Sequence, residues 1–253
     1  YYGKALAIDT VVFDKIHPKV AIRYNNLGLA WASKGKYDKA IEYYGKALAI
    51  DTVVFEKIHP KVAIRYNNLG EAWRSKGKYD KAIEYYGKVL AIDTVVFEKI
   101  HPDVAIDYNN LGEVWASKGK YDKAIEYYGE ALAIDTVVFE KIHPDVAIRY
   151  NNLGLAWASK GKYDKAVGYY GKALAIDTVV FDKIHPKVAI RYNNLGEAWR
   201  SKGKYDKAIE YYGKALAIDT VVFDKIHPKV AIRYNNLGEA WRSKGKYDKA
   251  IEY

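Results

Sequence analysis

Apolar residues follow a helical pattern in the segment that begins at His17. They recur at intervals of three and four residues, which places them on one face of an amphipathic helix. These positions are Val20, Ala21, Tyr24, Leu27, Gly28 and Trp31. Pro18 suits the first turn of a helix, with His17 in the cap position, and Gly35 supplies a stop because glycine tolerates left-handed backbone. We therefore predict a helix over residues 18–34.

A second apolar stripe follows after a short turn. It consists of Ala40, Ile41, Tyr44, Ala47, Leu48, Val54, Phe55 and Ile58. Asp38 marks its start, because an acidic residue is favoured at the positive end of a helix dipole. The β-branched run TVVF at 52–55 continues the helical phase, so we predict a second helix over residues 38–57.

Side-chain size and charge within the two stripes predict how the helices pack. Small residues at Gly28, Ala40, Gly45 and Ala47 permit close approach between helices, and large aromatic residues fill the remaining space. Asp51 lies on the second apolar stripe, where a carboxylate needs a partner. We expect a Tyr hydroxyl or a basic side chain from the adjoining first-type helix.

The same pair of predicted helices recurs every 42 residues along the chain. The markers of this period are His17, His59, His101, His143, His185 and His227, together with six equally spaced Trp residues. A fixed period of this length is typical of a stacked repeat array, in which each unit contacts its neighbours. We predict one array over 1–253: a partial repeat at 1–16, full repeats at 17–58, 59–100, 101–142, 143–184 and 185–226, and a partial repeat at 227–253.

The motif at 24–51 resembles a tetratricopeptide repeat. The resemblance rests on the spacing of Tyr24, Leu27, Gly28, Trp31, Ala40, Tyr44 and Ala47. The longer 42-residue form, with HPKVA at 17–21 and YNNLG at 24–28, resembles the repeats of kinesin light chains. This resemblance implies an all-α solenoid, a right-handed superhelix of antiparallel helix pairs.

Composition narrows the possible functions. The chain has no Cys, which excludes disulfide frameworks and thiolate sites. Its net charge of +10 suggests acidic partners, but the repeat at 101–142 carries eight acidic residues against four Lys. An acidic unit in mid-array disfavours a nucleic-acid track. No apolar run is long enough to span a bilayer and no signal peptide is evident, so we expect a cytoplasmic protein without a membrane partner.

Candidate chemistry is sparse. Each recurrent His precedes a Pro at a predicted helix start, which favours helix capping over metal binding or acid–base chemistry. No nucleophile with a partnering base and no phosphate-binding glycine loop stands out. We expect no catalytic residue, no metal site and no cofactor.

The resemblance also implies that the first helix of each repeat lines a concave groove. A recurrent amide then faces the groove, at Asn25, Asn67, Asn109, Asn151, Asn193 and Asn235. Amides both donate and accept hydrogen bonds, so they suit an extended peptide backbone. Hydrogen bonding from one repeat to the next is the alternative role for these residues.

Two variable positions of the first helix are the candidates for selectivity. The position of residue 29 holds Leu29 and Leu155 in two repeats and a Glu in the others, and the second variable position is that of residue 32. Glu71 with Arg74, and Glu197 with Arg200, form charged pairs three residues apart. Glu113 lacks such a partner because Ala116 replaces the Arg. These positions, with the Asn residues, form the predicted peptide-binding groove.

These observations predict a non-enzymatic scaffold that binds a protein or peptide. A self-assembling array is the alternative, because Tyr1 is in phase with Tyr43 and both ends of the chain fall within a predicted helix. Complementary ends would allow head-to-tail stacking of copies. A nucleic-acid binder is the third, less favoured class.

Overall fold

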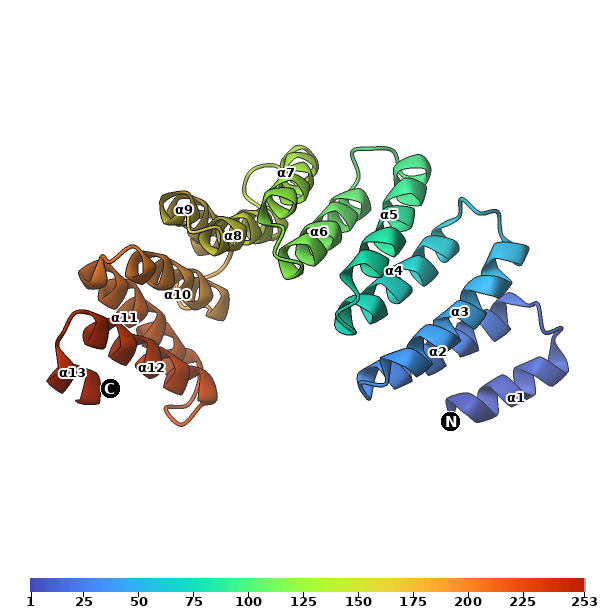
Figure 1. The fold of residues 1–253 in the computed structure, drawn as a ribbon, viewed down its shortest axis with the longest axis horizontal. Coiled ribbons are helices and arrows are strands. Elements are labelled where there is room, and N and C mark those ends of the chain that lie inside the picture. The colour runs from blue at the N-terminus through green and yellow to red at the C-terminus, as the bar shows by residue number, and fades with distance from the viewer. Residues whose placement is uncertain (253) are drawn as a thin grey trace. The chain divides into compact units, whose positions relative to one another are not determined.

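The computed structural model describes residues 1–252, and the regular structure in that range is entirely α-helical (Figure 1). Helices of 16 and 18 residues alternate. We call the first kind A helices (α2, α4, α6, α8, α10 and α12) and the second kind B helices (α3, α5, α7, α9 and α11). The bounds are α1 Tyr2–Val12, α2 Pro18–Ser33, α3 Tyr37–Val54, α4 Pro60–Ser75, α5 Tyr79–Val96, α6 Pro102–Ser117, α7 Tyr121–Val138, α8 Pro144–Ser159, α9 Tyr163–Val180, α10 Pro186–Ser201, α11 Tyr205–Val222, α12 Pro228–Ser243 and α13 Tyr247–Glu252.

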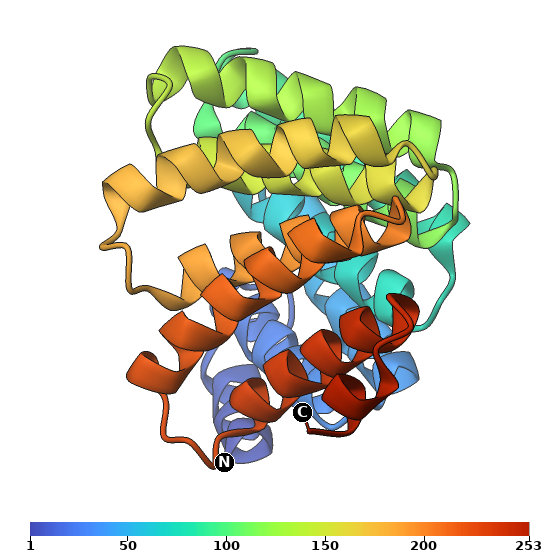
Figure 2. The same ribbon diagram turned by 90° about the vertical axis from the view of Figure 1, so that its left-hand side faces the viewer.

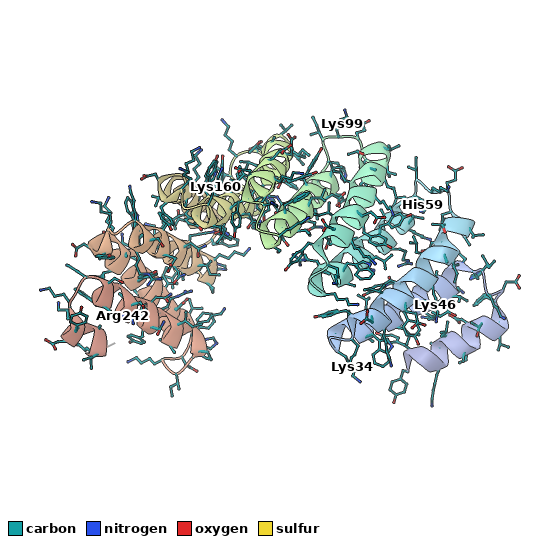
Figure 3. The ribbon with its side chains drawn as sticks, in the orientation of Figure 1. Lys34, Lys46, His59, Lys99, Lys160 and Arg242 are labelled. Carbon is teal, nitrogen blue, oxygen red and sulfur yellow. The ribbon has the colours of Figure 1, made fainter. Side chains whose placement is uncertain are left out.

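The A helices begin where the sequence predicts and end within one residue of the predicted end. The Nδ1 atom of His17 accepts the backbone N–H of Lys19 at 3.2 Å, so this His is a helix cap. His59 caps α4 in the same way and is labelled in Figure 3. Gly35 follows α2 with φ of +68°, the left-handed conformation that the stop requires.

The B helices end earlier than predicted. The predicted helix over 38–57 is observed as Tyr37–Val54, and the extension to residue 57 is wrong. Phe55 is extended, with φ of −112° and ψ of 155°, and its ring stacks on His59 with the centroids 4.4 Å apart. The stacking draws Phe55 out of the helix and joins the end of α3 to the start of α4.

The core is a row of small clusters of two alternating kinds. One kind lies within a repeat, where Val20 and Ala21 of α2 pack against Ala47 and Ile50 of α3. The other kind joins successive repeats: Ala40, Tyr44, Leu69 and Ala72 come from α3 and α4. An A or B helix inside the array therefore buries residues against both the preceding and the following helix.

Gly28 and Gly45, both predicted to permit close approach between helices, differ in how near their neighbours lie. A Cβ atom on Gly28 would lie 2.4 Å from the Tyr44 ring, so the close approach predicted there is confirmed. A Cβ atom on Gly45 would have no neighbour within 4 Å, so the same prediction for Gly45 is wrong. Gly45 points away from both neighbouring helices.

The chain forms two compact units, Tyr1–Tyr127 and the part from Tyr128 onward, with the boundary inside α7. In the first unit α1 packs on α2, and packing continues helix by helix to α6. In the second unit consecutive packing runs from α8 to α13. Neighbouring helices of each unit lie side by side in both views (Figures 1 and 2).

Candidate interaction surface

The recurrent Asn residues take part in stacking between repeats. Asn68 donates its side-chain N–H to the Oδ1 atom of Asn25 at 2.8 Å, which ties α4 to α2. The same bond joins Asn194 to Asn151 at 2.8 Å and Asn236 to Asn193 at 2.7 Å. The repeat-to-repeat alternative is therefore observed for Asn25, Asn151 and Asn193.

The remaining predicted Asn residues have other surroundings. Asn109 donates to the Oε1 atom of Glu113 at 2.9 Å on its own helix. Asn67 lines a cavity between α4, α5 and α6, and Asn235 is exposed on α12. Contact between any of these amides and a peptide stays a prediction.

The variable positions form one row of side chains on the A helices of each unit. Row 1 consists of Leu29, Glu71 and Glu113, and row 2 consists of Leu155, Glu197 and Glu239. Leu29 and Leu155 are each 47% exposed, a fraction similar to that of Ile64 (52%) and Ile106 (47%) on other A helices. Each row thus presents one exposed leucine followed by two carboxylates.

An arginine bridges the two carboxylates of row 1. Arg74 contacts Glu71 at 2.9 Å on α4 and Glu113 at 2.5 Å on α6. The prediction that Glu113 has no partner is therefore wrong, because its partner comes from the preceding repeat. Spacing along one helix could not reveal a bond between helices.

Row 2 repeats this arrangement. Arg200 contacts Glu197 at 2.9 Å and approaches Glu239 at 3.5 Å. Arg242, labelled in Figure 3, adds a contact of 2.6 Å to Glu239. The two rows are similar in chemistry although they belong to different units.

The first glutamate of each row is held as an anion. Burial alone would raise the pKa of Glu71, but hydrogen bonds from Arg74 and from the Tyr86 hydroxyl, the latter at 2.9 Å, bring it below its usual value. Glu197 has the corresponding partners Arg200 and Tyr212, and its pKa is also lowered. Both carboxylates therefore stay charged well below neutral pH.

A buried ion pair joins each B helix to the next A helix at most junctions. The Oδ2 atom of Asp51 on α3 lies 2.8 Å from the Nε atom of Arg65 on α4. This confirms the predicted basic partner for Asp51. The equivalent buried pairs are Asp135–Arg149, Asp177–Arg191 and Asp219–Arg233. Asp9 of α1 pairs in the same way with Arg23, which is partly exposed.

The junction between α5 and α6 breaks this rule. Asp107 occupies the position of the arginine, so it faces Asp93 as a second acid. Burial, followed by the adjacent Asp93, raises the pKa of Asp107 to about 8. Burial also raises the pKa of Asp93. The two carboxyl groups hydrogen-bond to each other, which requires a proton on one of them.

Sequence reasoning did not select Asp93 and Asp107 as site residues. The signal was available, because position 107 holds Asp where positions 23, 65, 149, 191 and 233 all hold Arg. The acidic charge of the repeat at 101–142 reflects this replacement in part. The replacement of Arg by Asp107 can be interpreted only once the structure shows that position 107 faces the buried carboxyl group of Asp93.

Two properties of residues 1–252 bear on metal binding and on membrane association. No group of three or more His, Cys, Asp or Glu side chains in this range is arranged to hold a metal ion. No helix in the same range combines the length and apolar character needed to cross a bilayer.

Comparison with known proteins identifies the repeat. The tetratricopeptide repeat pattern matches residues 24–95, 61–136, 103–178, 145–220 and 187–253, which together cover most of the chain. No curated protein matches the chain.

Solved structures show the same fold. The nearly identical TPR-like repeats described for a Podosopora anserina kinesin light chain superpose with a TM-score of 0.72 at 21% identity, covering 82% of this chain and 99% of that one. BtubC from P. vanneervenii gives a TM-score of 0.69 at 24% identity, covering 86% and 85%. MamA gives a TM-score of 0.56 at 27% identity, covering 81% and 95%.

Proposed function

Because the chain belongs to the tetratricopeptide repeat family, whose members are scaffolds for protein interaction, we propose that its A helices bind an extended protein segment. Such a segment lies along row 1 or along row 2, where the repeats differ from one another. Most of the remaining positions are the same in every repeat, so they offer the same chemistry from one repeat to the next.

The observation that carries this proposal is the exposure of Leu29 and Leu155 at the head of each row. An exposed leucine gives a partner an apolar contact, and burying it removes apolar surface from water. Glu71 and Glu113 keep carboxylate oxygens near the surface while Arg74 fixes their positions. The row therefore favours a segment with an apolar side chain followed by polar or basic ones.

Selection from a random peptide library tests the proposal. The immobilised chain is expected to enrich peptides that bind saturably, and Leu29→Ser combined with Leu155→Ser should weaken binding by about tenfold or more. The matched control is Val53→Ser combined with Val179→Ser, since both valines are 68% exposed on B helices. Equal binding by both double variants would overturn the proposal.

Self-association end to end is the second candidate function. It is favoured by Ile8 on α1, which is 61% exposed although its equivalent Ile50 is 8% exposed. A second copy stacked on α1 would cover this apolar side chain. Sedimentation velocity over a hundredfold range of concentration tests it: a constant monomer would exclude stacking, and Ile8→Ser should weaken any assembly that forms.

A further inference from the structure

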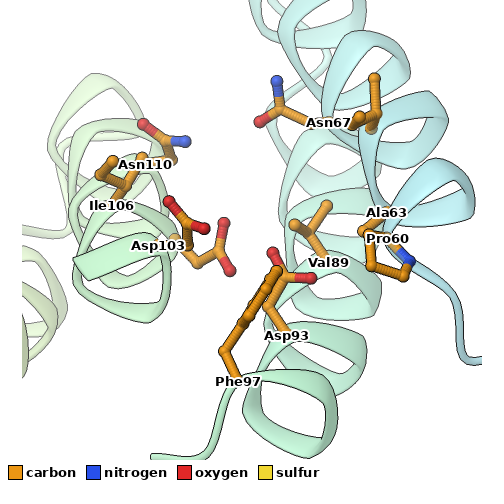
Figure 4. Close-up of a pocket in the computed structure, with 11 residues that line it drawn as sticks. Pro60, Ala63, Asn67, Val89, Asp93, Phe97, Asp103, Ile106 and Asn110 are labelled. Carbon is orange, nitrogen blue, oxygen red and sulfur yellow. The ribbon is translucent and has the colours of Figure 1, made fainter. Parts of the chain in front are cut away.

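A cavity of about 340 Å³ lies at the unusual junction between α5 and α6. Asp93 of α5 and Phe97, which follows α5, line one side, and Asp103 and Asp107 of α6 line the other. Figure 4 shows Asp93 and Asp103 pointing toward one another across the space. Asp107 is only 4% exposed, and its Oδ2 atom has no hydrogen-bond partner.

Two cations found at other junctions are replaced by acids at this one. The first is the arginine that pairs with the buried Asp of the B helix, as Arg65 pairs with Asp51. The second is a lysine over the ring of the phenylalanine that follows the B helix, as Lys61 lies 4.5 Å from the Phe55 ring centroid.

The equivalents of these two cations in the third full repeat are Asp107 and Asp103. The cavity therefore retains both surfaces that receive a cation elsewhere in the chain, namely the Asp93 carboxylate and the Phe97 ring. Within residues 1–252, no Lys or Arg side chain lines this cavity.

We propose that this cavity binds the guanidinium group of an arginine side chain carried by a partner protein. The group would enter between α4 and α6 and occupy the place that Arg65 or Arg191 fills at the intact junctions. Asp93 and Asp107 would accept its N–H groups. The proposal is independent of rows 1 and 2, because the cavity shares no residue with them.

The lining favours a guanidinium over a bare metal ion. Guanidinium is flat and weakly hydrated, so it tolerates contact with apolar walls and stacks on aromatic rings. Those walls are present in Val89, Ile64 and Ile106, together with the Phe97 ring. The carboxylates lack the arrangement that a metal ion needs. A forked donor also matches two carboxylates better than a single ammonium does.

Binding should depend on pH through the carboxyl pair. The titratable groups that face it are Asp103 and His101, at the start of α6. The lining residues of α4 are Pro60, Ala63, Ile64 and Asn67, none of which titrates. The pair that shares one proton carries a single negative charge, and loss of that proton gives the bound cation a second carboxylate to pair with. Binding should therefore release a proton and tighten as the pH rises from 6 to 9.

Titration with blocked amino acids tests the proposal on the full chain. The probes are N-acetyl-arginine methylamide and the neutral N-acetyl-citrulline methylamide, followed by NMR of the Val and Ile methyl groups. The arginine compound is expected to shift the Val89 and Ile106 signals saturably, with affinity about tenfold or more above that of citrulline. Free L-arginine should bind no more tightly than the blocked arginine compound, because the proposed ligand is an arginine side chain within a protein.

Three variants decide the outcome. Asp107→Arg supplies the missing guanidinium internally and should abolish binding, and Asp107→Asn should weaken it about tenfold or more. Asp145→Asn is the matched control, since Asp145 is the equivalent of Asp103 at a junction where Arg149 is retained. The control should bind as the original chain does.

Several results would overturn the proposal. The first is the absence of a saturable shift with 20 mM of the arginine compound at pH 8.5, and the second is equal binding of the arginine and citrulline compounds. The others are binding by Asp107→Arg that equals that of the original chain, and tighter binding of free L-arginine than of the blocked arginine compound. Circular dichroism of each variant, with the expected rise in thermal stability for Asp107→Arg, confirms that a loss of binding does not reflect unfolding.

Discussion

At the scale of single residues, the same side chain has different consequences according to what faces it. Asp51 and Asp93 occupy equivalent positions, yet Asp51 meets Arg65 and Asp93 meets Asp107. The sequence alone predicted that Asp51 needs a partner, either a Tyr hydroxyl or a basic side chain. It could not show that Asp107 occupies the position of the basic partner of Asp93, because Asp93 and Asp107 come from different helices and are 14 positions apart.

The carboxyl pair predicts an unusual dependence of stability on pH. The pKa of Asp107 is raised to about 8, whereas an aspartate in an unfolded chain titrates near pH 4. Between these values the folded chain holds a proton that the unfolded chain loses, so stability falls as the pH rises. Compared with Asp107→Asn, the original chain should lose about 2–4 kcal/mol more between pH 5 and pH 8.

Urea denaturation at pH 5, 6.5 and 8 measures this effect. Asp145→Asn again serves as the control and should follow the pH profile of the original chain. Parallel profiles for the original chain and Asp107→Asn would show that the pair does not hold an extra proton.

At the scale of helices, periodicity predicted most of what the structure contains. The apolar stripes located both kinds of helix, and His-Pro and Gly marked the A helices to within a residue. The end of the B helix was missed because Phe55 leaves the helix to stack on His59, a contact with the next helix. The Arg74–Glu113 bridge was likewise missed, because it joins two repeats and spacing within one helix does not specify it. Hydrogen bonding between Asn residues of successive repeats was one of the two roles predicted for them, and it is observed.

Two glycines of one repeat should respond in opposite ways to alanine. Gly28→Ala would place a Cβ atom 2.4 Å from Tyr44 and force α2 and α3 apart, which should cost about 1–3 kcal/mol. Gly45→Ala meets open space within a helix and should stabilise the chain by about 0.5–1 kcal/mol. Thermal unfolding followed by circular dichroism distinguishes them, and a loss of stability in both would contradict the packing described for Gly45.

At the scale of the whole molecule, near-identical repeats make the junctions comparable with one another. The junction of α9 and α10 has the buried pair Asp177–Arg191, whereas the junction of α5 and α6 lacks such a pair. In a repeat array, local stability depends on the interfaces between neighbours. The weakest junction should therefore open first.

Hydrogen exchange checks this expectation. At pH 8, the amides of α6 should exchange about tenfold or more faster than those of α10, since breaking a buried pair is strongly destabilising. Asp107→Arg should bring the two rates together. Equal exchange in the original chain would mean that the ion pairs do not stabilise the junctions.

The central claim is that the chain binds a protein segment on its A helices at the positions where repeats differ. Methyl NMR with a peptide from the library selection tests it most directly. The account predicts that signals of Leu29 or Leu155 shift on binding, while those of buried Leu69 and Leu195 and of exposed Val53 and Val179 stay in place. Shifts confined to Val53 and Val179 on the B helices would contradict it.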